Sequence, residues 1–214
     1  MRSYRQHCGL ARALDVVGDR WTLLIVRDLL IGEARYTDLL KGLPGIATNL
    51  LAERLSDLAA AGLVVREAIP APMATTVFRL TARGEELRPV VHALGRWAAP
   101  LVARPRKGDR FQSRWMALPI ELNLRDRAPA AAPFAIQIRT GDQPIVVASD
   151  RGRVRVRTGV TPHPDAVVSG APDVVLAVML GKIGVTAARA RGVTFEGDTK
   201  ILRRLRPVQS GAAL

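Results

Sequence analysis

Acidic residues are scarce in this chain of 214 residues, because 32 Lys and Arg face 19 Asp and Glu and give a net charge of +13. Such an imbalance indicates a polyanionic partner. The surplus is uneven, since residues 1–104 carry a net charge of +4 and residues 105–214 carry +9. The arginines of the second half either contact phosphate groups or form a solvated face, and we favour the solvated face.

Cysteine and long apolar runs are also scarce. The single cysteine, Cys8, excludes an intramolecular disulfide and is typical of a reducing compartment. The longest apolar stretch, near 174–180, lies between Asp173 and Gly181 and is too short to cross a membrane. Residues 1–5 lack the apolar segment of a signal peptide. We therefore expect a soluble, cytoplasmic protein that does not insert into membranes.

Catalytic motifs are missing as well. His7, His92 and His163 lie far apart and show no metal-ligand spacing with Cys8. Gly181-Lys182 lacks the upstream glycine of a phosphate-binding loop, and no Gly-x-Ser-x-Gly sequence occurs. We expect no catalytic residues, no metal and no cofactor, and we do not expect an enzyme.

What the chain does contain is a helix, a turn, a second helix and a hairpin between residues 35 and 80. Leu43-Pro44-Gly45 cannot continue a helix, so it separates a helical pattern at 35–40 from one at 46–61. Gly62 stops the second helix, and strands at 63–65 and 76–80 flank a Pro-rich tip. This order predicts a winged helix-turn-helix, which places its second helix in the major groove of DNA. The apolar stripe of that helix comprises Ile46, Leu50, Leu51, Leu55 and Leu58.

The polar face of the second helix indicates how DNA would be contacted. Thr48 and Asn49 stand near its N-terminus, where side chains reach base edges and N–H groups meet phosphate. A merely solvated face is the alternative, and the order of elements favours the groove. The wing tip, 71–75, has no basic residue, so we expect little affinity from it. The predicted DNA-binding residues are Arg35, Thr37, Ala47, Thr48, Asn49, Arg54, Arg66 and Arg79.

Further helices are predicted around this motif. Residues 10–17 form an amphipathic pattern, and residues 20–31 are apolar on nearly every side, as in a core helix. Thr81 caps a helix that runs from 82 to 99 and ends at Pro100. Its apolar stripe exceeds what one small winged domain needs to cover: Leu87, Val90, Val91, Leu94 and Trp97.

Residues 8 to about 100 resemble the HxlR-type winged-helix transcriptional regulators. The resemblance implies a homodimer that controls a promoter near its own gene, with residues 1–104 as the DNA-binding and dimerisation domain. It assigns the first and last helices to the dimer interface. Gly9 and Ala47 depart from the family, which usually has proline and often serine at these positions. The matching segments are Cys8, 18–25, 35–39, 43–46, 55–58, 61–64, 78–81, Gly84 and Trp97.

Cys8 is the residue with reactive potential. In the resembling family a cysteine at this place sometimes senses oxidants or electrophiles through its thiolate. The alternative is a buried, small apolar side chain. Arg5, His7 and Arg12 are close enough in sequence to lower the pKa of the thiol.

The second half changes to the period of a β-sheet. A polar linker at 104–109, a helical pattern at 111–118 and a spacer at 127–133 precede it. Strands are predicted at 134–138, 145–148, 153–157, 165–169 and 193–196, with helices at 173–180, 183–190 and 199–205. The fold class is therefore α+β, with a mostly antiparallel sheet and helices on one face.

Residues 111–206 resemble the sterol carrier protein type 2-like domains. The resemblance rests on the hairpins, Pro164-Asp165, Leu180-Gly181 and the ending at 192–198. It implies a tunnel for an apolar molecule, although most of the apolar residues also suit a plain core. Trp115 is the residue best placed to face a ligand or the other domain. The predicted ligand-binding residues are Trp115, Phe134, Ile136, Ile138, Val154, Val156, Val178 and Phe195.

Three functional hypotheses follow. The first is a dimeric repressor that binds DNA sequence-specifically and is controlled by an apolar small molecule in the second domain. The second is a repressor that responds to oxidants or electrophiles through Cys8. The third is a lipid-binding or carrier protein whose winged domain serves for dimerisation.

Overall fold

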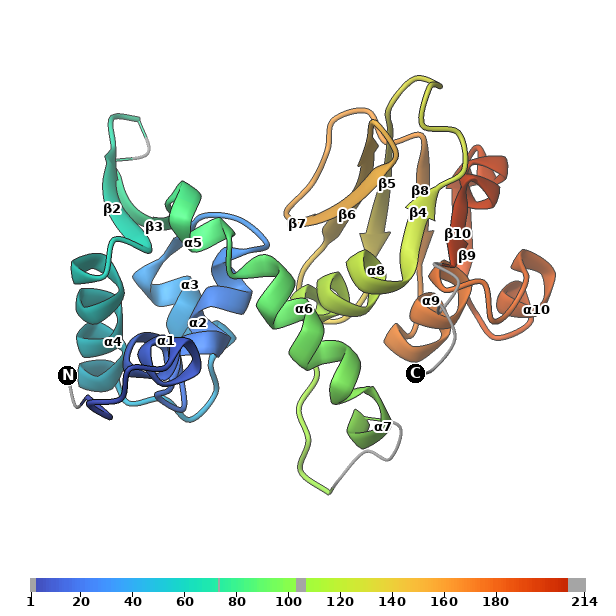
Figure 1. Ribbon diagram of the computed structural model, residues 1–214. Helices are drawn as coiled ribbons and strands as arrows, with labels where there is room; N and C mark the ends of the chain where they lie inside the picture. Colours follow the sequence, from blue (N-terminus) through green and yellow to red (C-terminus); the bar gives the residue numbers. More distant parts are fainter. Residues whose placement is uncertain (1–2, 73, 103–106, 208–214) are drawn as a thin grey trace. The chain divides into compact units, whose positions relative to one another are not determined.

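The computed structural model describes residues 3–72, 74–102 and 107–207 (Figure 1). Two compact units divide the chain, unit 1 from Met1 to Leu94 and unit 2 from Gly95 to Leu214. Residues 104–106 of the predicted linker and Met73 of the predicted wing tip lie outside the described residues.

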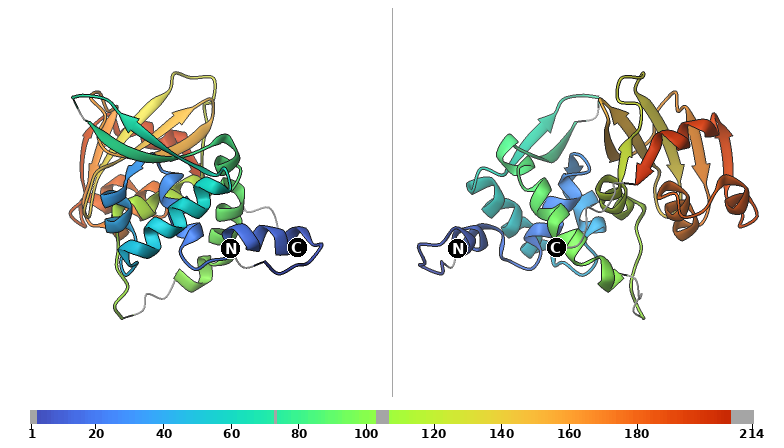
Figure 2. Two further views of the ribbon diagram at one scale, coloured as in Figure 1. Left: turned by 90° about the vertical axis from the view of Figure 1, so that its left-hand side faces the viewer. Right: turned by 45° about the vertical axis from the view of Figure 1, so that its right-hand side comes forward.

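Helices and a small sheet form unit 1. Because Leu39, Leu51 and Leu58 are almost fully buried, α3 and α4 are anchored in the core. The sheet has the strand order β1-β3-β2, and all its pairs are antiparallel. Figure 2 shows its β2–β3 hairpin projecting from the helices of the unit as a wing. The elements are α1 Gly9–Val17, α2 Thr22–Leu29, β1 Ala34–Arg35, α3 Tyr36–Gly42, α4 Thr48–Ala60, β2 Val64–Ile69 and β3 Thr75–Leu80.

The ends of α4 agree with the sequence prediction. Gly62 adopts a φ of +71°, and the Leu63 N–H donates to the carbonyl oxygen of Leu58 at 2.9 Å. A residue with a side chain is disfavoured in that conformation, so glycine ends the helix here. At the other end Ala47 is the N-cap and provides no side-chain hydrogen bond, as its methyl group requires.

The single helix predicted over 82–99 is wrong. The chain forms α5 Ala82–Glu85, α6 Arg88–Trp97 and α7 Ala99–Val102. Pro89 has no N–H to donate to the Glu85 carbonyl, so a continuous helix would lose a hydrogen bond at this point. Thr81 caps α5 as predicted, since its hydroxyl oxygen accepts the Gly84 N–H at 3.0 Å. Pro100 is the second residue of α7 instead of ending the long helix, and proline is tolerated in the first turn of a helix.

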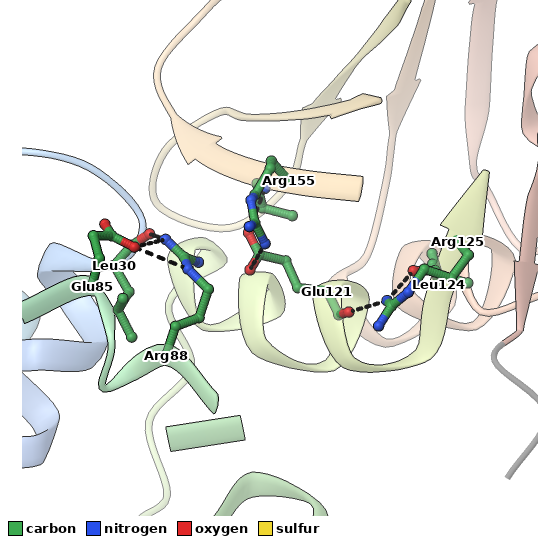
Figure 3. A network of polar contacts seen from close by, with 8 residues as sticks. Leu30, Glu85, Arg88, Glu121, Leu124, Arg125 and Arg155 are labelled. Carbon is green, nitrogen blue, oxygen red and sulfur yellow. Dashed lines mark hydrogen bonds and ion pairs between the residues drawn. The ribbon is translucent and has the colours of Figure 1, made fainter. Parts of the chain in front are cut away.

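Arg88 holds the joint between α5 and α6 in place. Its guanidinium donates to the Leu30 carbonyl and to the Glu85 carboxylate, both at 2.9 Å (Figure 3). The joint is thereby tied to the end of α2 within unit 1.

Unit 2 is built on a five-stranded sheet with the order β7-β6-β5-β8-β9. Its pairs are antiparallel except β5 with β8, which is parallel, so the sheet is mostly antiparallel as predicted. One face carries the core, including Ile136, Val147 and Val168, which are fully buried. The strands are β5 Phe134–Arg139, β6 Ile145–Asp150, β7 Arg153–Thr158, β8 Ala166–Ser169 and β9 Thr194–Gly197.

The remaining elements of unit 2 differ in part from the predictions. The helix predicted at 111–118 is a 3-10 turn, η1 Ser113–Met116, which continues into α8 Ala117–Asn123. Helices α9 Pro172–Met179 and α10 Val185–Arg189 lie where they were expected. The last predicted helix is a 3-10 helix, η2 Thr199–Arg204. A second small sheet, β4 Leu124–Asp126 with β10 Leu205–Pro207, was not predicted.

Two buried carboxylates, Asp126 and Glu121, hold peripheral elements of unit 2 in place. Asp126 accepts bonds from Arg204 at 2.6 and 3.1 Å and from the Ser149 hydroxyl at 2.6 Å. Burial raises the pKa of Asp126, but the hydrogen bonds from Arg204 and Ser149 outweigh it and hold the pKa below its usual range. Glu121 accepts the Val156 N–H at 2.8 Å and pairs with Arg155 at 3.6 Å (Figure 3). Glu121 thus fixes the edge strand β7, and Asp126 fixes the segment that leads into β10.

Candidate nucleic-acid interface

The N-terminal end of α4 is an exposed part of the motif. Ala47, Thr48 and Asn49 are exposed, and the backbone N–H groups of the first helical turn have no partner within the helix. The Tyr36 hydroxyl donates to the Thr48 carbonyl at 2.5 Å. This bond joins the start of α3 to the start of α4, and so fixes the geometry of the helix-turn-helix.

The orientation of α4 follows from its buried leucines. Leu51, Leu55 and Leu58 are between 0 and 3% exposed, so the helix cannot rotate about its axis without exposing them. The opposite face, with Ala52 and Ser56, is exposed. Because Thr48 and Asn49 lie at its first turn, their side chains are presented outward by a rigid support.

Arg54 lies in a different environment from the one predicted. Its guanidinium pairs with Asp57 at 2.5 Å, Asp19 at 2.7 Å and Glu53 at 2.8 Å, and its side chain is only 15% exposed. A guanidinium held by several carboxylates is poorly placed to neutralise a phosphate. Asp19 lies between α1 and α2, so the arginine ties α4 to another part of unit 1.

Next to this cluster is an acidic hollow of about 530 Å³. Asp15 belongs to it, and hydrogen bonds from the Tyr4 N–H and the Ser3 hydroxyl lower the pKa of this carboxyl group. Negative charge on this side of α4 repels phosphate, which leaves the N-terminal end as the suitable approach for DNA. The lining residues are Ser3, Tyr4, Leu14, Asp15, Gly18, Asp19, Glu53, Arg54 and Asp57.

The two arginines of the wing point to opposite faces of the hairpin. Arg66 is opposite Phe78 in the register and Arg79 is opposite Val65, and neighbouring register pairs alternate between faces. Arg79 shares its face with Glu67 and pairs with it at 2.6 Å. Both arginines are exposed, but the structure does not bring them together as a single phosphate-binding pair.

Arg35 and Thr37 lie at the beginning of α3, and both are exposed. They flank Tyr36, whose hydroxyl reaches Thr48, so these two predicted residues lie near the start of α4. Sequence reasoning missed Tyr36 and Asp19 as the residues that position α4. The helical spacing could not reveal either contact, because both partners come from other elements.

Cys8 is exposed and is the N-cap of α1. The buried alternative is therefore wrong. Interaction with the backbone N–H groups of Ala11 and Leu10 lowers the pKa of the Cys8 thiol, and its slight burial opposes the shift. The cause is the start of the helix, whereas the neighbouring arginines were expected to provide it.

The predicted ligand-binding residues of unit 2 fall into two groups. Phe195 and Trp115 are partly exposed. The other six are at most 7% exposed and lie in the core: Phe134, Ile136, Ile138, Val154, Val156 and Val178. Phe134 also faces the Arg204 guanidinium, at 4.8 Å from its ring centre.

The described residues contain neither a metal-binding cluster nor a membrane-spanning helix. Across the parts of the chain that the structure describes, no group of three or more His, Cys, Asp or Glu side chains is arranged to hold a metal ion. Within those same parts, no helix is long and apolar enough to cross a membrane.

The helices and wing of unit 1 define a winged helix-turn-helix protein, and comparison with known proteins gives the family. Residues 16–105 match the HxlR-like helix-turn-helix family, and residues 120–210 match the SCP-2 sterol transfer family. The chain belongs to the HxlR-like family of transcriptional regulators and carries an SCP-2 domain at its C-terminal end.

Two sequence relatives agree with this assignment. The HTH-type transcriptional regulator YvaP of Bacillus subtilis is 34% identical over 87 residues, which cover 41% of this chain and 81% of the relative. The regulator Rv3095 of Mycobacterium tuberculosis is 35% identical over 134 residues, or 63% of this chain and 78% of the relative. The solved structure of reduced YodB from B. subtilis is 28% identical, has a TM-score of 0.40 and covers 49% of this chain and all of that one.

Proposed function

We propose that the protein is a dimeric, sequence-specific DNA-binding repressor. Its α4 helix enters the major groove and contacts base edges through Thr48 and Asn49, while Arg35, Thr37 and Arg66 contact the backbone. The observation that carries this proposal is the exposed N-terminal turn of α4 on a buried leucine stripe. Arg54 and Arg79 are left out of the contact set because their guanidinium groups pair with carboxylates.

A double substitution of Thr48 and Asn49 by alanine tests this proposal. Each specific base contact contributes roughly 1–3 kcal/mol of discrimination, so operator affinity should fall at least tenfold. Binding of the variant and of the wild-type protein to fragments of upstream DNA is measured by fluorescence anisotropy. The thermal unfolding temperature should stay unchanged, because both side chains are exposed.

The matched control replaces an asparagine and a threonine of unit 2, Asn123→Ala with Thr186→Ala. Both residues are exposed, and operator affinity should be unaffected. Unchanged sequence-specific binding by the Thr48/Asn49 variant would count against the proposal. A wild-type protein without sequence-specific binding would instead favour a carrier protein whose winged domain serves for dimerisation.

We further propose that an apolar small molecule bound in unit 2 controls DNA binding. The SCP-2 family assignment and the apolar face of the sheet support this role. The six buried residues form the core against which such a molecule would rest, and Trp115 and Phe195 are the partly exposed candidates for direct contact. Control requires the molecule to bind one dimer arrangement more tightly than another.

The exposed thiol of Cys8 favours a second candidate, a repressor that responds to electrophiles. Because the pKa of Cys8 is lowered, the thiolate exists at lower pH in the folded chain than in the unfolded chain. The rate of alkylation should therefore rise at a lower pH in native protein than in denaturant, as measured by mass spectrometry over a pH series. Alkylation should weaken DNA binding, and the Cys8→Ser variant should not respond. Unchanged affinity after complete alkylation would remove this candidate.

A further inference from the structure

Most of the excess positive charge belongs to unit 2. Residues 1–94 carry a net charge of +2, whereas residues 95–214 carry +11. The unit with the recognition helix is thus nearly neutral, although proteins that bind DNA neutralise several phosphates with basic side chains. The charge of unit 2 has no assigned role in the proposed DNA contacts.

Three arginines of β7 form a row that we name the arginine stripe: Arg153, Arg155 and Arg157. All three are exposed, whereas Val154 and Val156 between them are 2% and 3% exposed. Side chains alternate between the faces of a strand, so the three arginines project from one face at intervals of roughly 6.7 Å. The stripe is therefore a row of positive charge along one face of a strand.

The strand that carries the stripe is rigidly held. It pairs with β6 from Asp150↔Arg153 to Ile145↔Thr158, and its valines are buried. On its other edge the Val156 N–H donates to the buried Glu121 carboxylate at 2.8 Å. Little backbone entropy remains to be lost when the stripe binds a partner.

The stripe keeps a surplus of positive charge over the acidic residues around it. On β6, Val146 and Ala148 lie opposite Arg157 and Arg155 in the register, and Asp150 lies opposite Arg153. The Glu121 carboxylate lies 3.6 Å from the Arg155 guanidinium, beside the edge of the strand. Arg157 has no acidic residue opposite it on β6, and its guanidinium donates to the neutral Val160 carbonyl at 3.3 Å, so its charge is not balanced by these neighbours.

We propose that the arginine stripe binds the phosphate backbone of double-stranded DNA and adds sequence-independent affinity to the contacts made by α4. This inference rests on the proposed function, because unit 1 brings the DNA to the chain. Covalent linkage then gives unit 2 a high effective concentration near the same duplex. Guanidinium groups match phosphate oxygens in geometry and remain charged at all relevant pH values.

DNA suits this surface better than an anionic membrane does. Residues 151–160 contain no Trp, Tyr or Phe, the side chains that anchor proteins at a membrane interface. Val160 is the one large apolar side chain exposed in this segment, and a single valine buries little surface in lipid. The stripe therefore offers charge without the apolar component of a membrane anchor.

The test uses the full-length protein with Arg153→Gln and Arg157→Gln combined. Arg155 is kept, because it pairs with the buried Glu121 and its loss would disturb the fold. The matched control is Arg191→Gln with Arg203→Gln, which removes the same charge from exposed positions of unit 2. Dissociation constants for a random-sequence duplex are measured over a series of salt concentrations.

The stripe variant should lower the slope of log K against log salt by about two, and the control should leave it unchanged. An unchanged slope in the stripe variant, or an equal loss in the control, would overturn the inference. If the wild-type protein bound no duplex at all, the proposed function itself would fail. Loss of binding to phosphatidylserine vesicles with an unchanged DNA slope would assign the stripe to a membrane and also overturn it.

Discussion

Arg54 joins α4 to the segment between α1 and α2 through Asp19, and it also pairs with Asp57 and Glu53 on its own helix. A mostly buried arginine with three carboxylate partners has little capacity left for a phosphate. We therefore assign it to positioning the recognition helix. The sequence places the same residue on the polar face of α4, and only the positions of its partners distinguish the two roles.

Asp19→Asn separates these roles by the sign of its effect. If Arg54 positions α4, losing the Asp19 partner loosens the helix and weakens DNA binding, by roughly two- to fivefold for a partly exposed ion pair. If Arg54 contacts phosphate, the same change frees its guanidinium and strengthens binding. Anisotropy titrations with upstream DNA measure the direction.

A general charge effect requires its own control. Glu33→Gln removes an equal charge from an exposed position of unit 1, and any strengthening by that variant gives the background. The DNA affinity of Asp19→Asn should be lower than that of Glu33→Gln. An equal or higher affinity would show that Arg54 serves as a phosphate contact.

At the scale of elements, local chemistry made α4 predictable. Its leucine spacing, the turn at Leu43-Pro44-Gly45 and the stop at Gly62 act within a few residues of one another, so the sequence pattern contains the information. The alternation of Val154 and Val156 with arginine made β7 predictable in the same way. Neither case depended on distant partners.

Elements that depend on distant partners were missed. The strands β4 and β10 have three residues each and lie about 80 positions apart in the chain. Asp126 of β4 pairs with Arg204, the residue directly before β10, and no local pattern indicates this contact. The break before α6 was a different error, because Pro89 is a local signal that the strong apolar stripe of the helix concealed.

The candidate site was predictable to the level of its face but not of its contacts. Helical spacing correctly placed Thr48 and Asn49 outward. It could not show that strand register separates Arg66 from Arg79, since register depends on pairing across the hairpin. For the same reason the stripe on β7 was visible as a pattern, while the rigid support beneath it was not.

At the scale of the whole molecule, α6 leaves a strongly apolar surface exposed. Val90, Leu94 and Trp97 follow one another at helical spacing and are 44, 45 and 76% exposed, and Leu10 of α1 is 69% exposed. Monomeric proteins rarely expose several large apolar side chains along one helix, so a second copy of this chain is the partner we propose for α6. A two-fold dimer would also present two recognition helices to successive half-sites roughly 34 Å apart.

Native mass spectrometry of Leu94→Glu tests the dimer, with Ala93→Glu on the neighbouring face of α6 as the control. Burying a carboxylate in an apolar interface is costly, so Leu94→Glu should give monomers at concentrations where wild type and control remain dimeric. Operator affinity should fall with it, because a monomer engages one half-site.

The same spectra test the effector, since a bound apolar molecule adds mass that disappears on denaturation. A wild-type protein of single-chain mass would contradict the dimer, whereas a dimer without added mass would move control of DNA binding from unit 2 to Cys8.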